Sequence, residues 1–179
     1  RNGEGAAVFD VVFSTTRFTC FHGNAAQISG PFMSMEPLQI LIDGEFYAEA
    51  DAKISVFDHG LLYGDGVFEG IRFYNDHVFR LEEHIDRLFD SAKAIHLKIP
   101  ATRDEVCKMV TDTVAKNGLH DGYIRLVVTR GTGTLGLSPY QCEKASIICI
   151  AATITLYPEE YYRDGLILAT CSTRRPTHD

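Results

Sequence analysis

The sequence lacks features that would place it among membrane or nucleic-acid-binding proteins. No apolar run in its 179 residues approaches the length of a membrane-spanning helix. Lysine and arginine number 17 against 24 acidic residues, which gives a net charge of -7. A field of that sign does not attract nucleic acid or anionic lipid. We therefore expect neither a nucleic acid nor a membrane among its partners.

Paired cysteines and zinc-ligand patterns are missing as well. None of the five cysteines forms a C-x-x-C pair, and the seven histidines are scattered without metal-ligand spacing. We interpret the cysteines as reduced thiols of a cytoplasmic protein, and we expect no metal site.

The first part of the chain also has little periodicity. Residues 1–34 follow neither a helical nor a strand period, and we expect them to be a poorly ordered or non-native extension. We expect an α+β domain over residues 35–171. Residues 172–179 are then expected to begin an interdomain loop that leads to a C-terminal catalytic domain outside this chain.

Short runs rich in apolar residues predict strands, several of them in hairpins. Residues 38–42 and 45–48 flank Asp43-Gly44, a dipeptide that favours tight hairpin turns. Asn75-Asp76 has the same place between two later runs. The other expected strands are residues 67–74, 77–79, 123–130, 146–153 and 166–171.

Between these strands the apolar period changes to that of a helix. Residues 81–95 place apolar side chains on one face and charged ones on the other. Thr102 and Glu105 form a capping box that begins a second helix, which ends at Asn117-Gly118. Strands followed by two helices and more strands predict an α+β fold. We expect a mainly antiparallel sheet with two helices on one face.

The stretch YGDGVFEGIR, residues 63–72, combines glycines with aromatic rings. Glycines permit tight turns and close approach of another group to the backbone, and the rings can form an apolar wall. The pattern has neither the strand–G-x-G-x-x-G–helix order of a dinucleotide site nor the ending of a Walker A loop. From spacing alone, a simple turn between strands remains an equal alternative.

Two segments carry a resemblance to a known family. DHGLLYGDGVFEGIRFY, residues 58–74, and VFRLEEHIDRLFDSAKAI, residues 78–95, resemble the N-terminal half of class IV (fold type IV) aminotransferases. Branched-chain amino acid aminotransferases are the most similar, and the resemblance extends over residues 36–179. It implies the cofactor pyridoxal 5'-phosphate. It also implies branched-chain amino acids, glutamate and 2-oxoglutarate as partners, in a homo-oligomer.

The resemblance implies that Arg80, directly after Phe79, binds the cofactor phosphate. A guanidinium suits this role because its planar fork of donors matches a phosphate and stays charged. The alternative is a surface arginine that pairs with Glu83 or Glu82 on the following helix.

The substrate pocket is implied to include three residues of the glycine-rich stretch. Tyr63 would be contributed across a dimer interface, Phe68 would contact the aliphatic side chain of the substrate, and Gly70 would leave room for it. Packing in the core is the alternative for Phe68. Arg72 is expected to be structural.

Two residues of the later strand are implied to receive carboxylates. Tyr123 would hydrogen-bond the substrate α-carboxylate, and Arg125 would bind the side-chain carboxylate of glutamate. An apolar wall with such a polar rim suits both leucine and glutamate. A cross-strand ion pair is the alternative for Arg125.

Several alternatives remain open. D-amino acid aminotransferases carry R-x-H after a T-R-G-T stretch. This chain has T-R-G-T at residues 129–132, but no R-x-H follows it. Aminodeoxychorismate lyases have E-T where this chain has Glu69-Gly70. The family's cofactor-binding lysine would lie beyond Asp179, so we assign no catalytic residue and expect the chain as given to be inactive. A standalone domain that binds a small molecule or a partner without catalysis is the remaining alternative.

Overall fold

The computed structural model describes residues 37–154, 157–170 and 172. The chain divides into two units, residues 1–35 and 36–179, and the described residues belong to the second. The predictions for residues 1–34 and 173–179 therefore lie outside the described residues.

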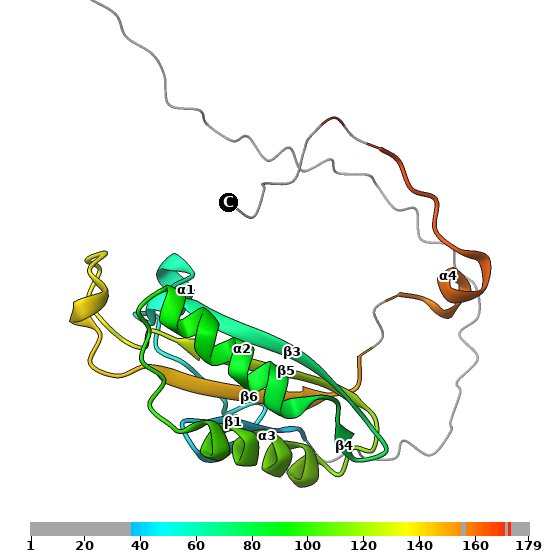
Figure 1. The fold of residues 1–179 in the computed structure, drawn as a ribbon, viewed down its shortest axis with the longest axis horizontal. Helices are drawn as coiled ribbons and strands as arrows, with labels where there is room; N and C mark the ends of the chain where they lie inside the picture. The colour runs from blue at the N-terminus through cyan, green and yellow to red at the C-terminus, as the bar shows by residue number, and fades with distance from the viewer. Residues whose placement is uncertain (1–36, 155–156, 171, 173–179) are drawn as a thin grey trace, which may run out of the picture. The chain divides into compact units, whose positions relative to one another are not determined.

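A six-stranded antiparallel sheet forms the centre of this unit (Figure 1). Its spatial order is β2-β1-β6-β5-β3-β4. The strands are β1 (Gln39–Ile42), β2 (Glu45–Ala48), β3 (Gly66–Tyr74), β4 (His77–Val78), β5 (Gly122–Thr129) and β6 (Ser146–Ala152). Both predicted hairpins are present, since β1 pairs with β2 and β3 pairs with β4.

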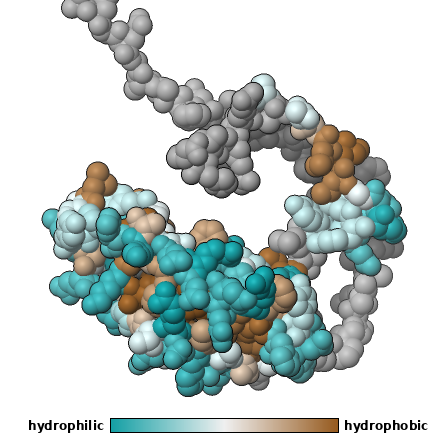
Figure 2. All heavy atoms as spheres, viewed as in Figure 1, coloured by the Kyte–Doolittle hydropathy of each residue, from teal (hydrophilic) through white to brown (hydrophobic). Residues whose placement is uncertain are grey.

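Two helices cover one face of the sheet, as the sequence predicts. They are α2 (Leu81–Ala94) and α3 (Arg103–Asn117). The predicted capping box begins α3, because the Thr102 hydroxyl accepts from the Glu105 amide and the Glu105 carboxylate accepts from the Thr102 amide. Polar side chains cover much of the surface over α2, coloured teal in Figure 2. The α+β fold with two helices on one face is confirmed.

Alternation along the central strands separates a helix-covered face from a helix-free face. On β3, Val67, Glu69, Ile71 and Phe73 are buried, while the residues between them are more exposed. The buried apolar ones join a single core with residues of α2 and α3. Because side chains of a strand alternate between faces, every second residue of β3 and β5 lies on the helix-free face.

One predicted strand is wrong. The described residues of 166–171 form no strand, and Leu166, Ile167 and Leu168 are exposed. A strand needs a neighbour for its backbone hydrogen bonds, and no described strand pairs with this run. Three short helices of the described residues have no counterpart among the predicted elements: α1 (His59–Tyr63), the 3-10 helix η1 (Pro139–Gln141) and α4 (Glu159–Asp164).

No helix among the described residues is long and apolar enough to cross a bilayer. They also contain no group of three or more His, Cys, Asp or Glu side chains arranged to hold a metal ion.

Candidate functional site

Four of the predicted site residues meet on the helix-free face of the sheet. Phe68 and Gly70 come from β3, and Tyr123 and Arg125 come from β5. Antiparallel pairing sets Gly70 directly opposite Arg125, and Arg72 opposite Tyr123. Side chains of a strand alternate between its two faces, and in this register the side chains of all these residues emerge on the same face.

The guanidinium of Arg125 stacks on aromatic rings of this group. Its Cζ lies 4.6 Å from the centroid of the Phe68 ring and 5.4 Å from that of Tyr123. The cross-strand neighbours of Arg125 are Gly70 and Ile150, and no carboxylate among the described residues pairs with it. A cross-strand ion pair is therefore the wrong interpretation, and the cation remains available to an anion on this face.

Phe68 does not pack into the core, because its side chain is 63% exposed. Gly70 leaves room for a side chain of the protein itself. A β-carbon at Gly70 would collide with the Tyr123 hydroxyl and would lie 3.0 Å from Tyr123 Cζ. The phenol of Tyr123 therefore already uses the space that the missing side chain leaves.

Tyr63 lies apart from these four residues, at the end of α1. Its hydroxyl donates a 2.6 Å hydrogen bond to the carbonyl of Leu135, and its ring meets the His59 ring edge to face at 5.0 Å. Neither interaction includes Phe68, Tyr123 or Arg125. The described residues give Tyr63 an anchor on the β5–β6 connection. Its contribution to a pocket remains a prediction.

Arg80 lies at the edge of the sheet beside β3, just before α2. The Phe79 amide donates to the carbonyl of Arg72, so Arg80 follows one residue later along this edge. Its Nε donates to Glu83 at 2.9 Å, which is the surface pair considered as the alternative, and its side chain is 63% exposed. The two Nη groups donate to no described residue. Arg80 also has a φ of 49°, a left-handed conformation that is uncommon outside glycine.

Sequence reasoning missed a buried carboxylate below this site. Glu69, on the helix-covered face of β3, accepts from Arg87 Nε at 2.7 Å, from Arg87 Nη2 at 2.6 Å and from His84 Nδ1 at 2.9 Å. Burial alone would raise the pKa of Glu69. The hydrogen bonds and charges of Arg87 and His84 outweigh burial and hold that pKa below its ordinary value. A single acid at a core position of the alternating strand is the signal that could have revealed it.

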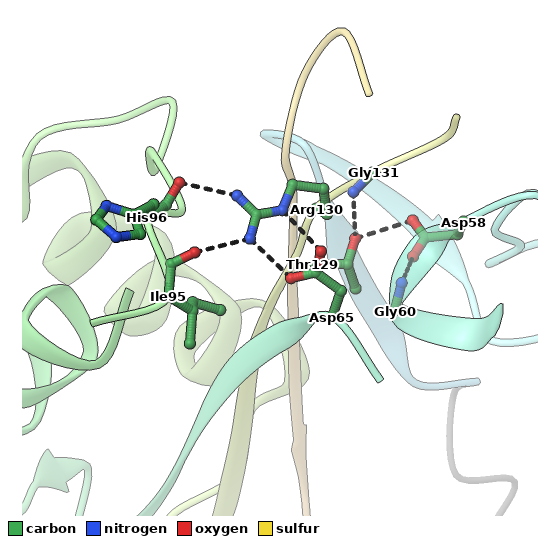
Figure 3. A network of polar contacts seen from close by, with 8 residues as sticks. All are labelled: Asp58, Gly60, Asp65, Ile95, His96, Thr129, Arg130 and Gly131. Atoms are coloured by element: carbon green, nitrogen blue, oxygen red, sulfur yellow. Dashed lines mark hydrogen bonds and ion pairs between the residues drawn. The ribbon is translucent and has the colours of Figure 1, made fainter. Parts of the chain in front are cut away.

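A second polar network holds α1 to the end of β5 (Figure 3). Asp58 is 2% exposed and accepts from the Gly60 amide at 2.7 Å and from the Thr129 hydroxyl at 2.8 Å. Arg130, one residue later, pairs with Asp65. The T-R-G tripeptide at the end of the strand was the available signal, but its carboxylate partners Asp58 and Asp65 lie more than sixty residues away in the sequence.

Comparison with known proteins assigns this arrangement to a family. The family model for amino-transferase class IV matches residues 66–179. A Methanocaldococcus jannaschii protein with a provisional assignment as a branched-chain-amino-acid aminotransferase is 54% identical over 138 residues, 77% of this chain and 47% of that protein. The Escherichia coli branched-chain amino acid aminotransferase structure has a TM-score of 0.64 at 36% identity, covering 68% of this chain and 41% of that one.

A further solved structure includes a cofactor adduct. This branched-chain amino acid aminotransferase, from the source abbreviated T.th. and complexed with N-(5'-phosphopyridoxyl)-L-glutamate, has a TM-score of 0.63 at 34% identity. The match covers 67% of this chain and 42% of the chain in that structure. The chain thus spans less than half the length of each of these three proteins.

Other activities occur among the similar proteins. The D-alanine aminotransferase of Listeria monocytogenes is 38% identical over 94 residues, 52% of this chain and 32% of that protein. Similarity to both kinds of enzyme identifies the family but not the substrate. The chain belongs to the class IV aminotransferases.

Proposed function

We propose that this chain is the N-terminal part of a pyridoxal-phosphate-dependent aminotransferase that moves the amino group of leucine, isoleucine or valine to 2-oxoglutarate. The observation that carries the proposal is Arg125. It is a cation without a carboxylate partner among the described residues, and it is stacked on Phe68 and Tyr123. The neighbouring strand residues on the same face are Val127 and Ile150, which are apolar.

That combination suits two substrates that share one pocket. Phe68 would contact the hydrocarbon side chain of a branched-chain amino acid. Arg125 would bind the side-chain carboxylate of glutamate, since stacking on rings leaves the outer N–H groups of a guanidinium free to donate. Tyr123 would donate its hydroxyl to the α-carboxylate. Gly70 would leave room for the side chain of the substrate, and Tyr63 would contribute to the pocket of a second copy.

The residues at the edge of β3 are compatible with the cofactor phosphate. Arg80 has two Nη groups without an acceptor among the described residues, and its left-handed backbone is of the strained kind found at ligand sites. Arg80 would hold the phosphate by these groups, in place of or beside Glu83. When bound, pyridoxal phosphate supplies an electron sink for proton loss from the amino acid. The protein orients the bond that breaks.

The test uses the complete polypeptide that contains this chain, assayed with 2-oxoglutarate and either leucine or D-alanine. We expect a yellow protein that uses leucine, and that loses its colour on borohydride reduction while the cofactor stays covalently bound. Preference for D-alanine would replace the proposed substrate by the one that the Listeria similarity favours. A colourless protein with no turnover would support the alternative, a domain that binds a small molecule or a partner without catalysis.

Two variants test the residue roles. Arg125→Met should raise the KM for glutamate by about tenfold or more and change the KM for leucine little, because only glutamate needs the cation. Arg80→Ala should lower cofactor retention. Arg103→Ala is the matched control, since its exposed pair with Asp86 lies on the helices. Equal losses for leucine and glutamate in Arg125→Met would contradict the assigned role.

A further inference from the structure

Arg130 joins three segments that are far apart in the sequence (Figure 3). Its Nε and Nη2 donate to the two carboxylate oxygens of Asp65 at 2.9 and 2.8 Å. Its Nη1 donates to the carbonyl of His96, and Nη2 also donates to that of Ile95, both at 2.9 Å. The guanidinium side chain is 11% exposed. Most of its donors are thus used within the protein.

The carbonyls that Arg130 binds are at the C-terminal end of α2. Helix ends leave carbonyls without partners and carry partial negative charge, so a buried cation there satisfies both. His96 turns the chain with a φ of 53°, and the Leu97 amide returns to the carbonyl of Ala92. Only a planar fork can serve this end and Asp65 together, whereas a lysine ammonium would be a point charge with fewer donors.

The other end of this contact lies where α1 stops. Asp65 follows Gly64, the left-handed cap of α1, and precedes β3. The Asp65 carbonyl accepts from the Arg130 amide at 2.9 Å, so backbone and side chain of Arg130 both hold the same residue. A five-residue helix is too short to be stable by itself, and therefore such contacts decide its position. Tyr63 is its last residue.

We propose that Arg130 is a positioning residue that fixes the end of α1, and with it Tyr63, against β5 and the C-terminal end of α2. Its effect on substrate binding rests on the proposed function, in which Tyr63 borders a pocket. The effect of Arg130 on the position of α1 does not rest on it, because the contacts of Arg130 with Asp65 hold the end of α1 beside the contact of Asp58 with Thr129.

Hydrogen exchange on the 179-residue chain tests the positioning. In Arg130→Lys, the amides of Gly64 and Asp65, which bond to α1 carbonyls, should exchange about tenfold faster or more. Amides of β6 should stay within about twofold of the wild type. Arg130→Met should show a larger effect than Arg130→Lys, and Arg103→Lys should show none at α1. Unchanged exchange at Gly64 and Asp65, or equal acceleration throughout the sheet, would overturn the proposal.

Kinetics of the complete polypeptide test the consequence for substrate. Arg130→Lys should raise the KM for the amino acid about three- to tenfold while kcat changes less than about twofold, since Tyr63 borders the substrate without reacting. Tyr63→Phe should have a similar effect, and the double variant should be less than additive. A lower kcat at constant KM, or full additivity, would overturn the link to Tyr63. If the wild type has no aminotransferase activity, the proposed function fails, and exchange still decides the position of α1.

Discussion

The phenol of Tyr123 occupies the space that a side chain at Gly70 would need. The two residues belong to neighbouring strands, and Tyr123 lies opposite Arg72, one step along the same face. Close approach of a ring to the strand backbone is possible only where the β-carbon is missing. The position of Tyr123 at the site therefore depends on the glycine.

Gly70→Ala should displace the Tyr123 ring. The atom in its way is the far end of a side chain, so the ring can move and the cost should be about 1–2 kcal/mol of unfolding free energy. Urea unfolding measures this cost. Tyr123→Phe removes the colliding hydroxyl, and in that background the cost of Gly70→Ala should be smaller. A double-mutant cycle without coupling would contradict the contact.

Thr129→Val should reveal the value of the buried hydroxyl on Asp58. Valine keeps the shape but leaves one carboxylate oxygen of Asp58 and the amide of Gly131 without their partner. We expect a loss of about 1–3 kcal/mol in unfolding free energy. Thr111→Val is the matched control, because that hydroxyl is exposed on α3. Equal effects of the two substitutions would argue against a special role for the buried one.

Glu69→Gln should remove an acid-dependent part of the stability. The folded-state pKa of Glu69 lies below its ordinary value, because Arg87 and His84 outweigh the effect of burial. Its contribution is therefore complete above the ordinary pKa of 4.5 and is lost as the pH falls through the folded value. Near neutral pH the variant should lose about 1–3 kcal/mol, since a carboxylate between two donors is removed.

The difference between wild type and Glu69→Gln should shrink as the pH is lowered from 6 to 3. Unfolding by urea at a series of pH values measures this convergence. Glu82→Gln, on the exposed side of α2, is the control and should lack it. A difference that is constant with pH would show that the charge of Glu69 is not involved.

Cys149 should resist thiol reagents in the folded chain. Burial raises its pKa to about 11, although a hydrogen bond with Thr113 opposes this rise, and its side chain has no exposed surface. Little thiolate exists at pH 8, and the reagent cannot reach it. Peptide-resolved mass spectrometry should find Cys107 and Cys142 labelled before Cys149, since both are partly exposed. Labelling of Cys149 at the same rate without denaturant would contradict its burial.

The sequence predicted those elements whose signals are local. The Asp43-Gly44 turn and the Thr102 capping box depend on neighbours within a few residues, and β2 and α3 appear where these patterns place them. The wrong strand at residues 166–171 shows the converse. A short apolar run has a tendency to extend, but pairing requires a partner strand that the run itself does not specify.

The site could be predicted as a set of residues but not as an arrangement. Nothing local states that Gly70 lies opposite Arg125, because the pairing of β3 with β5 spans both helices. Similarly, α1 is too short for periodicity to reveal, and its contacts with Thr129 and Arg130 close long loops. The pair of Arg80 with Glu83 is the exception, since it spans one helical turn and was foreseen as an alternative.

Arg125 also affects self-association through the helix-free face of the sheet. Exposed apolar surfaces on a sheet favour association between identical copies, and the side chains of Phe68 and Tyr74 are both exposed on this face. Stacking two such faces would trap like charges, because Arg72 and Arg125 both lie among these rings without a carboxylate partner in the described part of the chain. An anion bound between the arginines would lower this electrostatic repulsion. The two arginines therefore disfavour self-association through this face of the sheet.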